Sequence, residues 1–256
     1  MKQTNCILFC RCGAKVIADA RADDLSNRLK KLDADVMELS DLCAFSVHSP
    51  QSLLDITAGY TQKVIVACYP RAVKNMLRQG GATLENVTVV NFRAFDNDEV
   101  VSTLQSDYGF EAGAANYRIE KTGLDVPAWY PVIDESRCTS CGQCARFCLF
   151  GVYKFERKKL EVTNPLNCKN NCPACGRTCP TQAIIFPRLG ENSVLSGAEP
   201  VEKAQQNHGK QGSLFVLLNE RNKSRLSIFR EGVVQLAEDE RRKALEELKN
   251  VNKKKE

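Results

Sequence analysis

The sequence predicts an α/β domain on a parallel sheet, a small cysteine-rich α+β module and a helical C-terminal tail. Residues 1–105 alternate short apolar runs with helix-like polar stretches, as in a sheet covered by crossover helices. Eight of the thirteen cysteines fall within residues 131–187, and the chain ends in a strongly charged stretch. A length of 256 residues allows about two domains. The expected organisation is 1–107 (α/β domain), 108–130 (linker), 131–187 (cysteine-rich module) and 188–256 (second linker and helical extension).

The strands and helices of the first domain are predicted from its apolar runs and from the glycines that end them. The expected strands are short apolar runs at residues 6–10, 36–39, 64–68 and 87–91. The expected helices are the stretches at residues 22–32, 50–56, 72–79 and 98–105. Gly80 and Gly81 mark the end of the third helix. Residues 106–130 show no sustained periodicity and contain several glycines, so we expect a linker or a loop over the module.

Composition limits the class of protein. Apolar residues make up 43% of the chain and charged residues 26%, which is typical of a globular protein and argues against disorder. No apolar run approaches the roughly 18 residues of a membrane span, and residues 6–10 are too short for the core of a signal peptide. We therefore expect a cytoplasmic protein without a membrane span. Thiols stay reduced in the cytoplasm, so clustered cysteines favour metal binding over disulfides.

Four of the five cysteines outside the module are expected at one edge of the sheet. Cys10 ends the first strand, Cys12 lies in the turn beyond it, Cys43 is expected in the loop after the second strand, and Cys68 ends the third. The carboxyl ends of parallel strands lie along one edge, where such folds build their binding crevices. The four thiols therefore converge. Cys6 falls in mid-strand and is expected to act as a small buried hydrophobe.

The module contains two runs of four cysteines. The first reads Cys138-x2-Cys141-x2-Cys144-x3-Cys148, and the second reads Cys168-x3-Cys172-x2-Cys175-x3-Cys179. Three thiolates in a tight loop hold three corners of a [4Fe-4S] cubane, and the fourth cysteine reaches the other cluster from the following helix. The ligand sets are therefore expected to cross. One set is Cys138, Cys141, Cys144 and Cys179, and the other is Cys168, Cys172, Cys175 and Cys148.

This segment resembles the bacterial-type two-cluster ferredoxin module, with every ligand position filled. It departs from the family at Leu149, where proline is usual, and at residues 169–171, where two residues are usual. The extra residue is expected to form a bulge that alters the hydrogen bonds of the cluster. Trp129 and Tyr130 are expected to pack at the module boundary with their polar atoms at the surface. The alternative is a pair of structural zinc sites in a scaffold or assembly protein.

The first 95 residues are similar to the N-terminal domain of the flavin-binding subunit of heterodisulfide reductase. The similar stretches are residues 9–13, the region of Cys43, residues 64–71 and residues 89–93. The resemblance implies a third [4Fe-4S] cluster on Cys10, Cys12, Cys43 and Cys68. The flavin-binding domain of that family is missing and the chain has no Gly-x-Gly-x-x-Gly turn, so no flavin is expected. Two alternatives are scattered free thiols and a thiol enzyme that reduces disulfides or transfers sulfur.

Charge and tail indicate protein partners and not nucleic acid. The formal net charge is +5, but each four-thiolate [4Fe-4S] site carries about −2, so three sites would cancel the basic excess. Basic residues after Arg221 alternate with acidic ones, as on a solvated helix. Apolar residues recur at 214–218, at 228–229 and in a stripe from Leu236 to Val251. We expect this tail to dock on another subunit or to pack on its own domain.

These features predict an electron-transfer protein that passes single electrons between redox protein subunits of a hetero-oligomeric complex. No catalytic residue is expected, because the sequence shows no acid and base pair or activated nucleophile in a recognisable motif. The chain is expected to belong to an oxidoreductase as one of its subunits and not to act as an enzyme alone.

Overall fold

The computed structural model describes residues 5–124, 126–200, 239 and 242. The chain divides into two compact units, Met1–Pro200 and Val201–Glu256. Apart from two residues, all that is described belongs to the first unit. The predicted helical tail and its apolar stripe lie outside the described residues. No described helix combines the length and the apolar character needed to cross a membrane.

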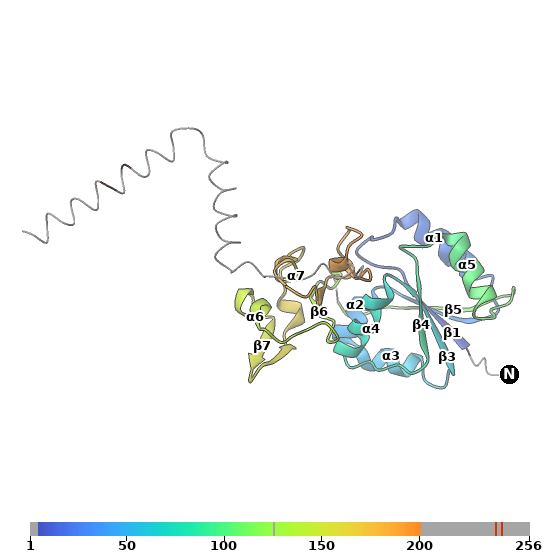
Figure 1. Ribbon diagram of the computed structural model, residues 1–256. Helices are drawn as coiled ribbons and strands as arrows, with labels where there is room; N and C mark the ends of the chain where they lie inside the picture. Colours follow the sequence, from blue (N-terminus) through green and yellow to red (C-terminus); the bar gives the residue numbers. More distant parts are fainter. Residues whose placement is uncertain (1–4, 125, 201–238, 240–241, 243–256) are drawn as a thin grey trace, which may run out of the picture. The chain divides into compact units, whose positions relative to one another are not determined.

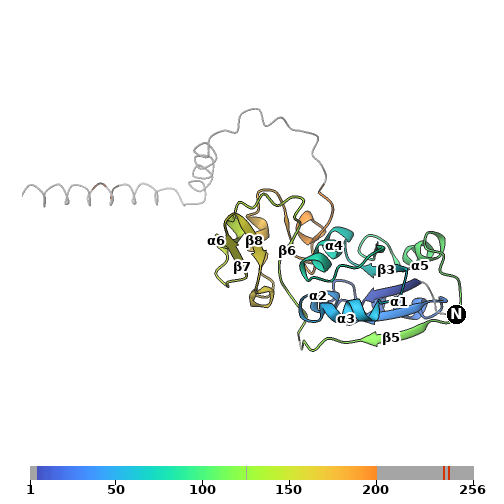
Figure 2. The same ribbon diagram turned by 90° about the horizontal axis from the view of Figure 1, so that it is seen from below.

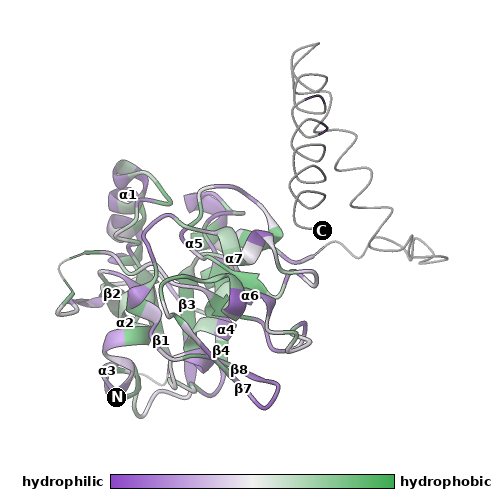
Figure 3. Ribbon diagram, turned by 90° about the vertical axis from the view of Figure 1, so that its left-hand side faces the viewer, coloured by the Kyte–Doolittle hydropathy of each residue, from purple (hydrophilic) through white to green (hydrophobic). Residues whose placement is uncertain are grey.

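A five-stranded parallel sheet forms the first domain (Figure 1). Its strands lie in the order β4-β3-β1-β2-β5, with β1 at the centre. Their bounds are β1 Asn5–Cys10, β2 Asp35–Leu39, β3 Gln62–Ala67, β4 Val87–Asn91 and β5 Asn116–Glu120. Residues Ile7 to Phe9 of β1 are fully buried, because helices cover both faces of the sheet. The central strands are accordingly hydrophobic along their length (Figure 3). The first four strands lie within two residues of the predicted ranges.

Five helices cover the sheet: α1 Asp19–Leu29, α2 Leu42–His48, α3 Pro50–Ile56, α4 Pro70–Gln79 and α5 Asn97–Ser106. Figure 1 shows α1 and α5 on one face and the other three on the opposite face. Prolines stand at the starts of α3 and α4, where the missing N–H costs nothing. A capping box between Asp96 and Glu99 begins α5.

Two elements differ from the sequence prediction. Residues 116–120, which the prediction assigns to a linker, form β5 at the sheet edge (Figure 2). This strand has no apolar run because it is half exposed, with Ile119 60% accessible. Residues expected as a loop after β2 form α2, which begins because the Asp41 carboxylate accepts the Cys43 backbone N–H at 3.0 Å. Cys43 therefore lies in the first turn of a helix.

The cysteine-rich module consists of short elements. β6 (Val132–Ile133) pairs with β9 (Ile184–Ile185), and β7 (Tyr153–Glu156) pairs with β8 (Lys159–Val162), both antiparallel. Two short helices, α6 (Gln143–Phe147) and α7 (Ala174–Arg177), each begin one residue before the third cysteine of a repeat. The same local sequence thus forms the same loop and helix twice.

Two arginines join the module to the sheet domain. The side chains of Arg71 and Asp134, 4% and 7% exposed, form an ion pair at 2.7 Å. Arg71 also donates to the carbonyl oxygens of Gln182 and Val194 at 2.8 and 2.9 Å. Arg93 donates to carbonyl oxygens of residues 187–191. A buried guanidinium is favourable only when its donors are satisfied, so these contacts fix the module at the sheet edge. Residues 188–200, predicted as part of a linker, belong to this packed unit.

Candidate iron-sulfur sites

The structure gathers four thiols at the carboxyl edge of the sheet. Cys10 is the last residue of β1, and Cys12 follows in a left-handed conformation with φ of 56°. Cys43 lies in the first turn of α2, and Cys68 directly follows β3. The first three are buried and Cys68 is half-buried. We call these four residues site N. Cys6 is fully buried at the other end of β1, beside Asp35 and Lys63 of the neighbouring strands.

The site N thiols lie close enough to perturb one another. Burial is the largest cause of the raised pKa of Cys43, and the thiols of Cys68, Cys10 and Cys12 add to it. Burial raises the pKa of Cys68 to about 12, with a further contribution from Cys12 and an opposing one from Arg93. The metal-free thiols are therefore protonated at neutral pH. Metal binding at site N must release protons.

In the module, a cavity of about 380 Å³ is lined by cysteines of both repeats. Cys148 of the first repeat lies there with Cys168, Cys172 and Cys175 of the second. We call these four residues site B. The remaining lining is almost entirely apolar: Pro131, Phe147, Leu149, Phe150, Val152, Tyr153 and Ala174. An apolar wall of this kind excludes water from a bound cluster.

The remaining four cysteines of the module are Cys138, Cys141, Cys144 and Cys179, which we call site A. Burial raises the pKa of Cys144 to about 12, and the thiols of Cys175, Cys179 and Cys138 contribute. The fourth cysteine of the second repeat thus lies near thiols of the first. Cys175 of site B also lies near Cys144, so the two sites are neighbours.

Donors from the module point at the sulfur atoms. The Tyr153 hydroxyl donates to Cys175 Sγ at 3.1 Å, and the Ala183 N–H donates to Cys179 Sγ at 3.3 Å. Hydrogen bonds to ligand sulfur tune the reduction potential of a cluster. Tyr153 was not predicted as a site residue, because in sequence it belongs to an ordinary apolar run.

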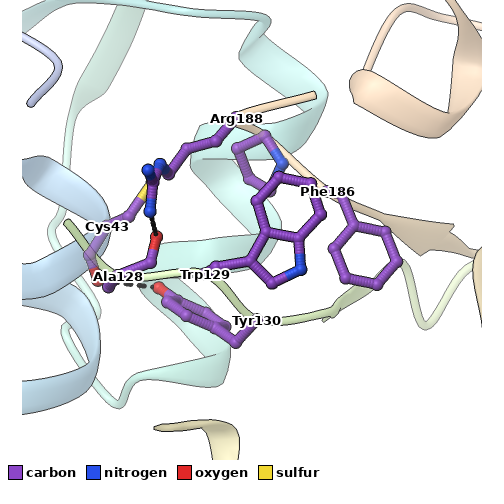
Figure 4. Close-up of a pocket in the computed structure, with 7 residues that line it drawn as sticks. Cys43, Ala128, Trp129, Tyr130, Phe186 and Arg188 are labelled. Atoms are coloured by element: carbon purple, nitrogen blue, oxygen red, sulfur yellow. Dashed lines mark hydrogen bonds between the residues drawn. The ribbon is translucent and has the colours of Figure 1, made fainter. Parts of the chain in front are cut away.

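A tight pocket lies between the site N residue Cys43 and the module (Figure 4). Its lining includes Trp129, Tyr130, Phe186 and Arg188, and it leaves no space for a water molecule. Trp129 stacks on Phe186 with ring centroids 5.2 Å apart, and the Tyr130 hydroxyl donates to the Cys43 carbonyl at 2.9 Å. The expectation that Trp129 and Tyr130 keep their polar atoms at the surface is wrong, because both side chains are buried.

The thiol groups fit [4Fe-4S] clusters by their chemistry. Each of the three sites offers four cysteine sulfurs, the ligand set of a cubane. Among residues 5–124 and 126–200, no three His, Cys, Asp or Glu side chains lie close enough to hold a single metal ion. A cubane separates its four thiolates more widely than a single zinc ion does.

A family model matches part of the module, and two curated proteins are similar to part of the chain. Residues 131–151 match the family model of the 4Fe-4S binding domain. An uncharacterised ferredoxin of Methanocaldococcus jannaschii is 48% identical over 61 residues, 23% of this chain and 42% of that protein. The thiosulfate reductase electron transfer subunit of Salmonella typhi is 28% identical over 89 residues, 32% of this chain and 46% of that protein. The chain spans less than half the length of these curated relatives. The cysteine-rich module is thus a 4Fe-4S domain of the ferredoxin type.

Proposed function

We propose that this chain is an electron-transfer protein with [4Fe-4S] clusters in sites A and B and a third in site N. The observation that carries the proposal is the site B cavity, in which Cys148 of one repeat joins three cysteines of the other. This is the arrangement that two adjacent cubanes require when the fourth ligands cross.

The third cluster is supported by the convergence of site N. Its cysteines come from three separate segments of the chain and meet at the edge where parallel sheets build their sites. Three of these thiols are buried and the fourth is half-buried, so a cluster bound there would be largely shielded from water. The similarity of this domain to the N-terminal domain of the flavin-binding subunit of heterodisulfide reductase is part of the same proposal.

When bound, such clusters supply reversible storage of single electrons. The protein itself holds the sulfur ligands, lines site B with apolar side chains, and donates hydrogen bonds from Tyr153 and Ala183. Arg71 and Arg93 hold the module against the sheet domain. A fixed separation between sites is what electron transfer through a protein needs.

The partners are proposed to be protein subunits of a hetero-oligomeric redox complex in the cytoplasm. Similarity to an electron transfer subunit supports this role. Phe147, Leu149 and Phe150 stand exposed around site B, with Leu149 90% accessible. Apolar side chains beside a redox site offer a surface for transient contact with a protein donor or acceptor.

The test is iron and acid-labile sulfide per chain in anaerobically purified protein. Three cubanes predict about 12 of each. A value of about 8 removes the third cluster, and a value near zero with bound zinc replaces the proposal by a zinc-stabilised scaffold. Cys43→Ala should lower the wild-type value by about four irons. Cys6→Ala is the matched control in the same sheet and should lower it by none.

A further inference from the structure

Two buried donors in the described part of the chain lack hydrogen-bond partners, and both border the same pocket. They are Trp129 Nε1 and Arg188 Nε. Leaving a buried N–H unpaired typically costs about 1–3 kcal/mol, so such a group calls for an explanation. Water is not the explanation, because the pocket has no room for it. The cysteines that pack in the same core as Trp129 offer sulfur atoms as acceptors.

Trp129 faces site B. Trp129 belongs to the buried core of the module, and Cys168 of site B packs against that core. Trp129 and Cys168 therefore share one packed cluster, although Trp129 Nε1 forms no hydrogen bond. Cys168 also packs against both the sheet-domain core and the module core.

Arg188 faces site N. It donates to the carbonyl oxygens of Pro127 and Ala128, and it lines the pocket together with Cys43 of site N. Figure 4 shows its guanidinium on the Cys43 side of the pocket, whereas Trp129 lies against Phe186 on the module side. Among the described cysteines of the module, Cys168 of site B is the one that packs against the sheet-domain core, which contains Cys10, Cys12 and Cys43. The packed connection from site N to the module therefore leads to site B.

We propose that Trp129 links site N to site B by donating its indole N–H to the Cys168 sulfur once site B is loaded. The inference rests on the proposed function and assigns the order N, B, A to the three sites. In each transfer from site N to site B, one electron leaves the first and enters the second. No bond is made or broken, and the indole keeps its proton. Arg188 offsets negative charge at site N, on the other side of the pocket from Trp129.

The experiment uses the full chain and its single tryptophan. In Trp129→Phe the ring still stacks on Phe186 but the N–H is lost. A hydrogen bond to sulfur stabilises the reduced, more negative state. We therefore expect an EPR redox titration of Trp129→Phe to show a more negative midpoint potential for one cluster. This cluster should be the one in site B, whose EPR signal is identified by its absence from Cys172→Ala. An unchanged midpoint, or a shift in the signal absent from Cys141→Ala, would overturn the inference.

A second measurement needs no substitution at Trp129. The chain gives one 15N-indole resonance, and contact with site B should shift or broaden it in the reduced protein. We expect Cys172→Ala to restore this resonance and Cys141→Ala, which disrupts site A, to leave it shifted. Restoration in Cys141→Ala alone would contradict the contact. Iron content separates the two failures: a wild-type chain without iron refutes the proposed function, whereas full iron with an unperturbed indole refutes only this link.

The order of the sites has its own readout in the same samples. Reduced clusters that lie close together split each other's EPR signals. Loss of site B in Cys172→Ala should remove the splitting of the site N signal, and loss of site A in Cys141→Ala should preserve it. The reverse result would place site A next to site N and overturn the order.

Discussion

The module and the sheet domain assemble cysteine sites in different ways. Sites A and B draw their cysteines from two short segments, 138–148 and 168–179, in which spacing and local helices place the thiols. Site N draws its cysteines from three segments that only the parallel sheet brings together. Spacing therefore specifies the module sites, whereas topology specifies site N. We therefore expect substitutions in the module and in the sheet domain to affect these sites for different physical reasons.

The largest expected effect comes from removing a fourth ligand. Cys148→Ala should lower iron by about four per chain, and it should remove the same EPR signal as Cys172→Ala although the two residues belong to different repeats. The physical reason is that Cys148 lines site B. If Cys148→Ala instead removed the signal that Cys141→Ala removes, the ligand sets would not cross.

The next-largest effect concerns the contact between the module and the sheet domain. Arg71→Met leaves the Asp134 carboxylate buried without its partner, which typically costs about 3–5 kcal/mol. Urea unfolding of the variant should show this loss. The double variant Arg71→Met with Asp134→Leu is the control, and it should recover most of the stability because no charge is left unpaired. If Arg71→Met were as stable as the wild type, the ion pair between Arg71 and Asp134 would not hold the module to the sheet domain.

A smaller effect is expected at Tyr153. Tyr153→Phe removes the hydroxyl that donates to Cys175 Sγ and keeps the ring. One hydrogen bond is worth roughly 1 kcal/mol, or some tens of millivolts for one electron. The site B midpoint should therefore become more negative by about that amount at unchanged iron content. A shift in the site N midpoint would contradict the placement of Tyr153.

The smallest expected effect concerns Cys6, a thiol of the sheet that lies outside sites A, B and N. Burial raises the pKa of Cys6 from 9.0 to about 12. Unfolded Cys6 ionises first as pH rises, so the folded state loses stability between about pH 9 and pH 12. We expect the unfolding free energy of metal-free Cys6→Ala to fall less steeply over this interval. Equal slopes in the variant and the wild type would show that Cys6 ionises equally easily in both states.

Sequence patterns predicted those features whose signals are local. Four of the strands form where the sequence has apolar runs, and the ferredoxin-type module was predicted from the cysteine spacing. β5 escaped prediction because an edge strand such as Asn116–Glu120 needs no apolar run. The signal for α2 was present in Asp41, a helix cap directly before Cys43.

Contacts between distant segments could not be predicted. No local sequence signal marks Arg71 and Arg93 as contacts of the module, and only the fold shows that they reach it. The same holds for Arg188, which lies in a stretch expected to be a linker. The buried nitrogen of Trp129 depends on residues from three segments that close the pocket around it.

The central claim is that topology builds a third cluster site beside the two that spacing builds. Quantitative low-temperature EPR of the fully reduced chain tests it most directly, because each reduced cubane contributes one unpaired spin. We expect about three spins per chain, falling to about two in Cys43→Ala. Two spins in the wild type, with no loss in Cys43→Ala, would contradict it.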